Sequence, residues 1–331
     1  MSIDRTFAIA GSGAYLPAAR IPVVELDRLT GLPPGSIHER FGVRWRHRAG
    51  AEETSSMMAA QAGQQALDEA GWDPASLDVI ISACGVMEQP IPSTAVLVQR
   101  RLGLGSSGIP AFDVNATCLS FLVALDRVLA GFALGEWRRA LIVCADISSA
   151  ALDWTDPEAS VLFGDGAAAI ALEAGGPHRR LAHLLRTYGD GAELCRLEAG
   201  GTRLRPADGI EPFLARARFR MDGPGVFKAT GRRFPGFLIE LFGKAGIAAD
   251  ALDCVIPHQA SRPALEHLKR ALPHGHDRTI DLFADVGNLI ATSLPFTLHH
   301  ARQAGLLKPG EHALLVGSSA GISLGGTVIQ W

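Results

Sequence analysis

The chain has 331 residues, of which 47% are hydrophobic and 20% charged, and its formal net charge is -3. This composition predicts a compact globular protein with a large core and excludes disordered and fibrous chains. The net charge is slightly negative, so it gives no reason to expect nucleic acid as a partner. The five cysteines include no C-x-x-C pair, so we expect neither zinc nor a disulfide framework, and a reducing, cytoplasmic location is the simpler interpretation.

The sequence contains no uninterrupted apolar stretch of the ~20 residues that span a bilayer. Its first residues lack the cationic start and long apolar run of a signal peptide. We therefore expect no membrane span.

Short apolar runs, many of them rich in β-branched residues, alternate with helical patterns along the chain. The runs lie at 7–16, 78–84, 140–147, 167–173, 253–259 and 312–319, and helical patterns include 57–71 and 262–272. This alternation predicts a layered α/β fold. The stretch from about 175 to 234 is rich in Arg, Gly and Pro, and we expect it to be an irregular insertion that shapes a substrate pocket.

An internal repeat indicates duplication. Residues 70–83 align without gaps with residues 245–258, and 138–148 with 311–321. The identical pairs in the first alignment are Ala70/Ala245, Gly71/Gly246, Leu77/Leu252, Asp78/Asp253 and Ile81/Ile256. We therefore predict two similar halves, 1–174 and 175–331, related by a pseudo-twofold axis.

The repeat relates three polar residues to one another. Cys118 in the first half and Asn288 in the second each lie between two echoing strands, where a turn leads into a helix. His258 ends a strand of the second half. If the halves pack about the axis, all three side chains meet at its centre.

Cys118 precedes a helical pattern that is apolar on nearly all sides, which is typical of a buried helix. The positive N-terminal end of such a helix lowers the pKa of a thiol, and its N–H groups can donate to an oxyanion. Alternatively, Cys118 is only a small buried hydrophobic residue without a catalytic role, which is our interpretation of the other four cysteines. The corresponding alternatives are a strand-capping histidine for His258 and simple turn chemistry for Asn288.

Four motifs in order, DVNATCLSF, PHQAS, DVGNLIATSLP and VGSSAGISLGG, resemble those of the 3-oxoacyl-acyl-carrier-protein synthase III family, and the likeness extends over almost the whole chain. The resemblance implies a thiolase-like fold of duplicated αβαβα architecture, a homodimer and a Cys118–His258–Asn288 triad. Backbone N–H groups of Cys118 and Ala320 would form the oxyanion hole.

The resemblance also implies the reaction. Cys118 would take an acyl group from acyl-CoA or an acyl carrier protein and then condense it with a malonyl thioester, without metal or other cofactor. Acyl transfer to a hydroxyl or amine, condensation of two acyl thioesters, and a non-catalytic partner subunit remain alternatives. Retention of all three triad residues favours catalysis.

The sequence departs from the family pattern in three places, and the first two bear on the substrate. Ser36 and Pro157 stand where relatives that use acetyl-CoA often clamp the adenine with Trp and Arg, although Arg40 is retained at the entrance. Gly85 and Ile91 are smaller than the usual acyl-pocket residues, which predicts a roomier pocket for a medium or long chain. Ser261 replaces the asparagine of the usual HQAN motif.

Other motifs are weaker. GSSAG lacks the downstream acid and histidine of a serine hydrolase, and GSGAYL lacks the third glycine of a dinucleotide fingerprint. Adjacent His299 and His300 point in different directions on a helix, so we expect no metal there. The basic residues are interpreted either as solvated surface or as docking sites for CoA phosphates or an acidic carrier; they are Arg40, Arg44, Arg46, His47 and Arg48, and Arg262, Lys269 and Arg270.

Overall fold

The computed structural model describes residues 6–331 of the chain. Its main sheet has nine strands in the order β11-β12-β13-β8-β1-β7-β6-β4-β5. Their bounds are β1 Thr6–Tyr15, β4 Val79–Ser82, β5 Ala111–Asp113, β6 Arg139–Asp146, β7 Gly166–Ala174, β8 His178–Gly191, β11 Cys254–Pro257, β12 His312–Ser319 and β13 Gly321–Gln330. Two short antiparallel pairs, β2 Arg20–Pro22 with β3 Trp45–His47 and β9 Cys195–Arg196 with β10 Arg220–Met221, lie outside it.

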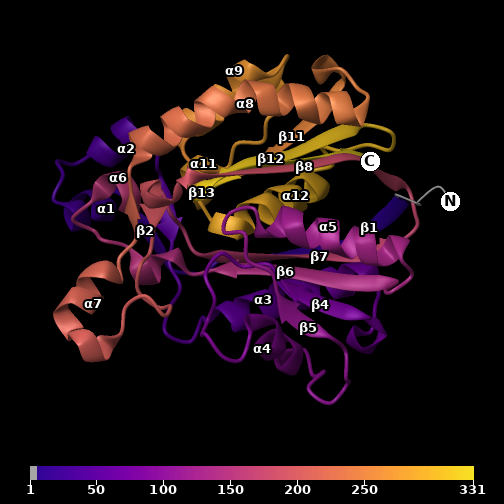
Figure 1. The fold of residues 1–331 in the computed structure, drawn as a ribbon, viewed down its shortest axis with the longest axis horizontal. Helices are drawn as coiled ribbons and strands as arrows, with labels where there is room; N and C mark the ends of the chain where they lie inside the picture. Colours follow the sequence, from indigo (N-terminus) through magenta and orange to yellow (C-terminus); the bar gives the residue numbers. More distant parts are fainter. Residues whose placement is uncertain (1–5) are drawn as a thin grey trace.

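The strands form two layers that share one short seam, where β1 pairs with β8 at only two positions. Five layers result (Figure 1). Helices α3 (Ser55–Ala70) and α4 (Thr94–Arg101) cover one outer face, and α8 (Gly223–Ala245) and α9 (Arg262–Ala271) cover the other. Helices α5 (Ser120–Ala133) and α12 (Ser293–Gln303) lie between the two strand layers.

The remaining helices are short. They are α1 Val23–Thr30, α2 Ser36–Phe41, α6 Pro157–Ser160, α7 Ile210–Arg216, α10 Gly275–Arg278 and α11 Phe283–Val286, with single 3-10 turns at Pro74–Ser76, Ser148–Ala151, Ala192–Leu194, Pro206–Asp208, Ala249–Ala251 and Ile290–Thr292. The predicted strands and helices all form. The predicted boundary at residue 174 falls between β7 and β8, and the division into two halves stays a prediction.

The apolar sequence of α5 is explained by its place in the central layer. Phe121, Leu122 and Leu125 of α5 pack in one buried cluster with Leu294 and Leu298 of α12. The window 117–134 is long and apolar enough, by length and composition alone, to cross a membrane. In this fold its apolar side chains are instead covered by the strands above and below, as expected for a core helix.

The stretch 175–234 is more regular than we predicted. It contains β8, a 14-residue strand at the centre of the sheet, and the first half of α8. Only the part between β8 and α8 is irregular. The predicted extent of the irregular part was wrong, because arginine on exposed positions of β8 and glycine and proline in α8 hide their periodicity.

The duplication extends to individual hydrogen bonds at the turns that precede α5 and α12. In each turn an asparagine side chain accepts from the N–H two residues on, and a serine hydroxyl accepts from the N–H four residues back. The bonds are Thr117 N to Asn115 Oδ1, Ile290 N to Asn288 Oδ1, Ala116 N to Ser120 Oγ and Leu289 N to Ser293 Oγ. The counterpart of Asn288 is therefore Asn115, three residues before Cys118, and not Cys118 itself.

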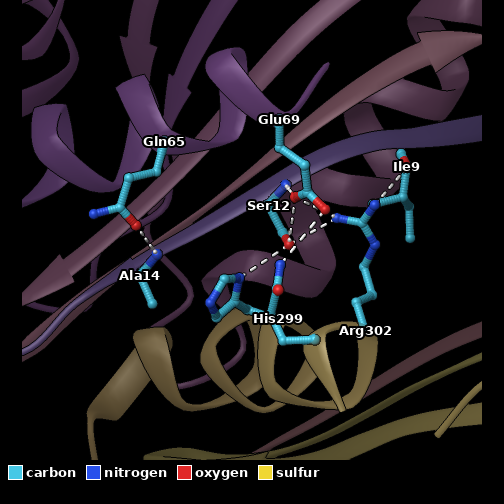
Figure 2. A network of polar contacts seen from close by, with 8 residues as sticks. Ile9, Ser12, Ala14, Gln65, Glu69, His299 and Arg302 are labelled. Atoms are coloured by element: carbon cyan, nitrogen blue, oxygen red, sulfur yellow. Dashed lines mark hydrogen bonds and ion pairs between the residues drawn. The ribbon is translucent and has the colours of Figure 1, made fainter. Parts of the chain in front are cut away.

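A polar cluster fastens α3 to α12 around the edge of β1 (Figure 2). The Glu69 carboxylate accepts from the N–H of Ser12 at 2.6 Å and from Arg302 at 3.1 Å. Arg302 also donates to the Ser12 hydroxyl at 2.7 Å, and Nδ1 of His299 lies 3.0 Å from that hydroxyl. The cluster satisfies edge groups of β1 that no neighbouring strand reaches.

Replacing Glu69 with glutamine tests this clamp. We expect the free energy of unfolding to fall by about 1–2 kcal/mol, because Arg302 loses its counter-charge while remaining mostly buried. Urea denaturation measures the change. Glu52→Gln, at an exposed position, is the matched control and should change stability by less than about 0.5 kcal/mol. Equal stability of the two variants would contradict the interpretation.

Candidate active site

A single cavity of about 1170 Å³ brings the predicted triad together. Cys118, His258, Asn288 and Ala320 all line it. Its walls come from both halves of the chain, since the nucleophile candidate belongs to the first and the other three residues to the second.

Cys118 lies in a constrained turn at the start of α5. The preceding residue, Thr117, has a φ of 50°, in the left-handed region that a β-branched residue rarely adopts. Its hydroxyl contacts that of Ser319, which also donates to the carbonyl of Ala116 at 3.1 Å. The turn is thus held against the β12–β13 connection that carries Ala320.

The electrostatic surroundings of Cys118 differ from our expectation. Burial raises the pKa of its thiol above the usual value, and the neighbouring Cys195 and Asp146 raise it further. The expected lowering of the thiol pKa was wrong, because desolvation of the thiolate is the largest effect on this group. The resting nucleophile is therefore a neutral thiol.

His258 follows β11 and is 5% exposed. Burial lowers the pKa of its imidazole to about 4, so the ring is neutral near pH 7. Its Nδ1 has no hydrogen-bond partner among residues 6–331. Gly317 allows the close approach here: a Cβ at that position would lie 2.6 Å from Cβ of His258 and 3.4 Å from Cδ2 of Leu119.

Asn288 is held by both of its amide atoms. Its Oδ1 accepts from the N–H of Ile290 at 2.8 Å, and its Nδ2 donates to the carbonyl of Ala260 at 3.4 Å. The second bond connects the turn of Asn288 to the loop that follows His258. The amide retains one further N–H with which it can donate to a ligand.

Arg46 supports the same turn from behind. It is buried and donates to the carbonyls of Val161 at 3.0 Å and Phe283 at 3.1 Å. A Cβ at Gly287, where φ is 73°, would lie 2.5 Å from its Nε. The interpretation of Arg46 as a solvated or docking residue was therefore wrong; it is a positioning residue for Asn288.

Ser261 caps α9, because its hydroxyl accepts from the N–H of Ala264 at 3.4 Å. The replacement of asparagine by serine in this motif thus keeps a local hydrogen bond. The preceding Gln259 is buried and donates to the carbonyl of Ile280 at 3.0 Å, which fixes the loop after His258.

Asp146 is a buried residue that the sequence analysis missed. Its carboxylate accepts from the N–H groups of Gly85 and Val86 at 2.8 Å and from the N–H and hydroxyl of Thr292 at 3.1 Å. Burial raises its pKa to about 6. Asp146 joins the loop after β4 to the start of α12, and an Asp at the end of a buried strand was the available signal.

The two predicted acyl-pocket residues have different surroundings. Gly85 lines the cavity, but a Cβ there would lie 2.4 Å from Cγ2 of Ile290, which also lines it. Ile290 therefore fills the space that the small residue leaves. Ile91 is 85% exposed and does not line the cavity within this chain, although residues 85–90 of the same loop do. The small size of Gly85 and Ile91 therefore does not enlarge the pocket.

Arg40 and Arg262, predicted at the entrance, both line the cavity and both are exposed. Arg40 forms an ion pair with Glu158, and Arg262 lies against Gly42 at the end of α2. Lys269, in contrast, is paired with Glu266 and Asp281, each at 2.8 Å, which makes it a poor docking residue.

A half-buried thiol at a helix start, with a neutral histidine and an anchored asparagine from the second half, defines a condensing enzyme of the thiolase fold. Solved structures agree. The 3-oxoacyl-[acyl-carrier-protein] synthase III of Aquifex aeolicus has a TM-score of 0.87 at 31% identity, covering 98% of this chain and 100% of that chain. Xanthomonas campestris OleA shares the fold with a TM-score of 0.86 at 20% identity, covering 98% and 99%.

Sequence comparison gives the family. Residues 112–191 match the family described as 3-Oxoacyl-[acyl-carrier-protein (ACP)] synthase III, and residues 242–331 match its C-terminal part. The Beta-ketoacyl-[acyl-carrier-protein] synthase III of Neisseria meningitidis is 34% identical, covering 98% of each chain, and that of Bordetella petrii is 36% identical over all of both. The chain belongs to the 3-oxoacyl-acyl-carrier-protein synthase III family, confirming the predicted family, fold class and acyl-transferring activity.

Replacing Asp146 with asparagine tests its structural role. An amide has one acceptor oxygen where the carboxylate has two, and its NH₂ would face N–H donors. We expect a loss of about 2–4 kcal/mol in the free energy of unfolding, because buried donors lose their acceptor. Urea denaturation measures it, with the exposed Asp73→Asn near α3 as control. A loss below about 1 kcal/mol would contradict the role.

Proposed function

We propose that Cys118 takes an acyl group from a thioester and that the acyl-enzyme then condenses with a malonyl thioester, with loss of carbon dioxide, to give a 3-oxoacyl product. The observation that carries the proposal is the single cavity shared by Cys118, His258 and Asn288. Membership of the synthase III family supports the reaction class.

In the first half-reaction the sulfur of Cys118 attacks the thioester carbonyl and the carrier thiol leaves. The thiol must lose its proton on attack, because burial holds it neutral. That proton passes to water, and the departing carrier thiolate takes one up in return, so His258 stays a neutral imidazole through this half-reaction. The N–H groups of Cys118 and Ala320 stabilise the tetrahedral oxyanion.

In the second half-reaction a malonyl thioester replaces the departed carrier. Nitrogen donors of His258 and Asn288 bind its carbonyl oxygen and stabilise the enolate that forms as carbon dioxide leaves. A neutral histidine suits this role, since the enolate is stabilised by hydrogen bonds without transfer of a proton. The carbanion then attacks the acyl group and releases Cys118. These steps require no metal or redox cofactor.

The apolar lining of the cavity supports a medium or long acyl chain. Leu152, Leu162, Phe163 and Phe219 belong to the wall, together with Met221. Arg40 and Arg262 at the mouth suit the phosphate of a CoA or of a carrier-bound arm, and an acidic carrier protein. Transfer to a hydroxyl or amine remains the second candidate, because acyl-Cys118 is common to both reactions.

Intact-protein mass spectrometry tests the nucleophile. With a ladder of acyl-CoA and acyl-carrier donors, we expect one acyl adduct that maps to Cys118 and is lost in Cys118→Ala. Cys195→Ala, which removes the other thiol in the cavity, is the control and should keep the adduct. An adduct on Cys118→Ala would overturn the assignment.

His258→Ala and Asn288→Ala should impair condensation far more than acylation. Loss of an enolate donor reduces the rate by about 10²–10³-fold, as for other oxyanion-hole donors. Malonyl thioester is added to pre-acylated enzyme, and product and carbon dioxide are measured. Equal loss in both half-reactions would contradict the division of roles, and product without carbon dioxide would favour plain acyl transfer.

The pH dependence of acylation follows from the raised pKa of Cys118. The thiolate fraction increases about tenfold for each pH unit below that pKa. We therefore expect the acylation rate to rise continuously between pH 6 and pH 9. Rapid-mixing mass spectrometry measures it. A plateau above pH 7 would show that the pKa of the Cys118 thiol lies below its usual value and would contradict the effect of burial.

A further inference from the structure

Ile290 is a cavity residue that the proposed reaction steps do not use. It lines the cavity and is half-buried, so part of its side chain faces the open space. It belongs to the same turn as Asn288, whose Oδ1 accepts from the N–H of Ile290 at 2.8 Å. The position of Ile290 is therefore tied to that of a triad residue.

On one side, Ile290 fills the space beside Gly85. A Cβ at Gly85 would lie 2.4 Å from Cγ2 of Ile290 and 3.5 Å from the carbonyl carbon of Thr117. Thr117 directly precedes Cys118 in the chain. The Cγ2 methyl group of Ile290 thus lies beside the turn that carries the nucleophile, where the first carbons of an acyl group on the sulfur would be held.

On its other side, Ile290 packs against a buried apolar cluster. The cluster includes Leu162 and Phe163, and Phe219 packs against it as well. These three residues line the cavity as part of the wall assigned above to the acyl chain. A chain that runs from Cys118 to this wall therefore passes Ile290 near its thioester end.

Ile290 is held rigidly in this place. Its φ is 52°, in the left-handed region that a β-branched residue rarely adopts, and the branch at Cβ restricts rotation of the side chain. The cluster behind it opposes a change of rotamer, because close-packed surroundings do not adapt without cost. Glycine would relieve the backbone strain at this position, so the isoleucine favours the shape of the cavity over backbone stability.

We propose that Ile290 and Gly85 form an interlocking pair that admits unbranched acyl chains and excludes chains with a methyl branch at carbon 2 or carbon 3. Ile290 occupies the space that such a branch would need beside the nucleophile. Gly85 carries no side chain because Ile290 already fills its place. Ile290 is thus a specificity-determining residue for acylation, an inference that rests on the proposed acylation of Cys118.

Competition between paired donors tests the inference. Dodecanoyl-CoA competes for the enzyme with an equal amount of 2-methyldodecanoyl-CoA, and in a second pair with 3-methyldodecanoyl-CoA, and mass spectrometry gives the ratio of the adducts. One extra carbon in an apolar pocket changes selectivity by about 10- to 200-fold. We therefore expect the unbranched adduct to exceed each branched adduct by about tenfold or more.

Ile290→Ala should bring this ratio close to one, because it opens the space that the branch needs. Gly85→Val alone should block acylation by every donor, since the new side chain meets Ile290. In the double variant Gly85→Val/Ile290→Ala, the volume removed on one side is added back on the other. Its preference for the unbranched chain should return to within about threefold of the wild-type value.

Ile210→Ala, at an exposed position outside the cavity, is the matched control and should keep the preference. Ile290→Val, which removes a single methyl group, should give an intermediate ratio and carries the test if Ile290→Ala does not fold. Equal branched and unbranched adducts in the wild type, or an unchanged ratio in the Ile290 variants that fold, would overturn this inference alone.

No adduct with any donor would instead overturn the proposed acylation. The pair is then judged by the thermal shift that free fatty acids induce. Dodecanoic acid should stabilise the wild type more than 2-methyldodecanoic acid does, and the difference should disappear in Ile290→Ala and decrease in Ile290→Val. Equal shifts in the wild type would overturn the inference on this measurement as well.

Discussion

The burial of two helices between two strand layers is the constraint on which the rest of this structure depends. Helix α5 and the first half of α12 expose little of their surface to bulk water, so their buried positions carry apolar side chains, while the second half of α12 carries the polar His299 and Arg302. The turns that lead into these helices therefore end deep inside the molecule. Any polar chemistry at those turns takes place in surroundings that exclude water.

That location determines the electrostatics of the site. Desolvation keeps the Cys118 thiol and the His258 imidazole uncharged. Two neutral groups in a dry cavity can donate hydrogen bonds without the solvation cost of a resident ion pair. A buried carboxylate nearby, Asp146, is surrounded by four donor contacts that also join the two halves. Its charge raises the pKa of the nucleophile further, so its structural role opposes thiolate formation.

Much of the fold could be predicted from the sequence, because the strand and helix periodicities and the repeat are strong. Motif order and the repeat also led to Cys118, His258 and Asn288, which line one cavity. Side-chain environment could not be predicted in the same way. Arg46 is buried although arginine is usually exposed, and Ile290 fills the space beside Gly85 although it is distant in sequence. Both depend on contacts between the halves, to which local patterns are insensitive.

The duplicated turns carry a further consequence. Thr117 and Ile290 hold equivalent left-handed conformations, with φ of 50° and 52°, where glycine would be free of strain. Neither can become glycine without loss, since Thr117 contacts Ser319 and Ile290 fills the space beside Gly85. The chain therefore gives up conformational stability at both turns to keep two side chains in place. Selection for thermal stability alone would be expected to place glycine at these two positions, which would remove the strain. The cavity would then lose its shape, so stability and function oppose each other at these two turns.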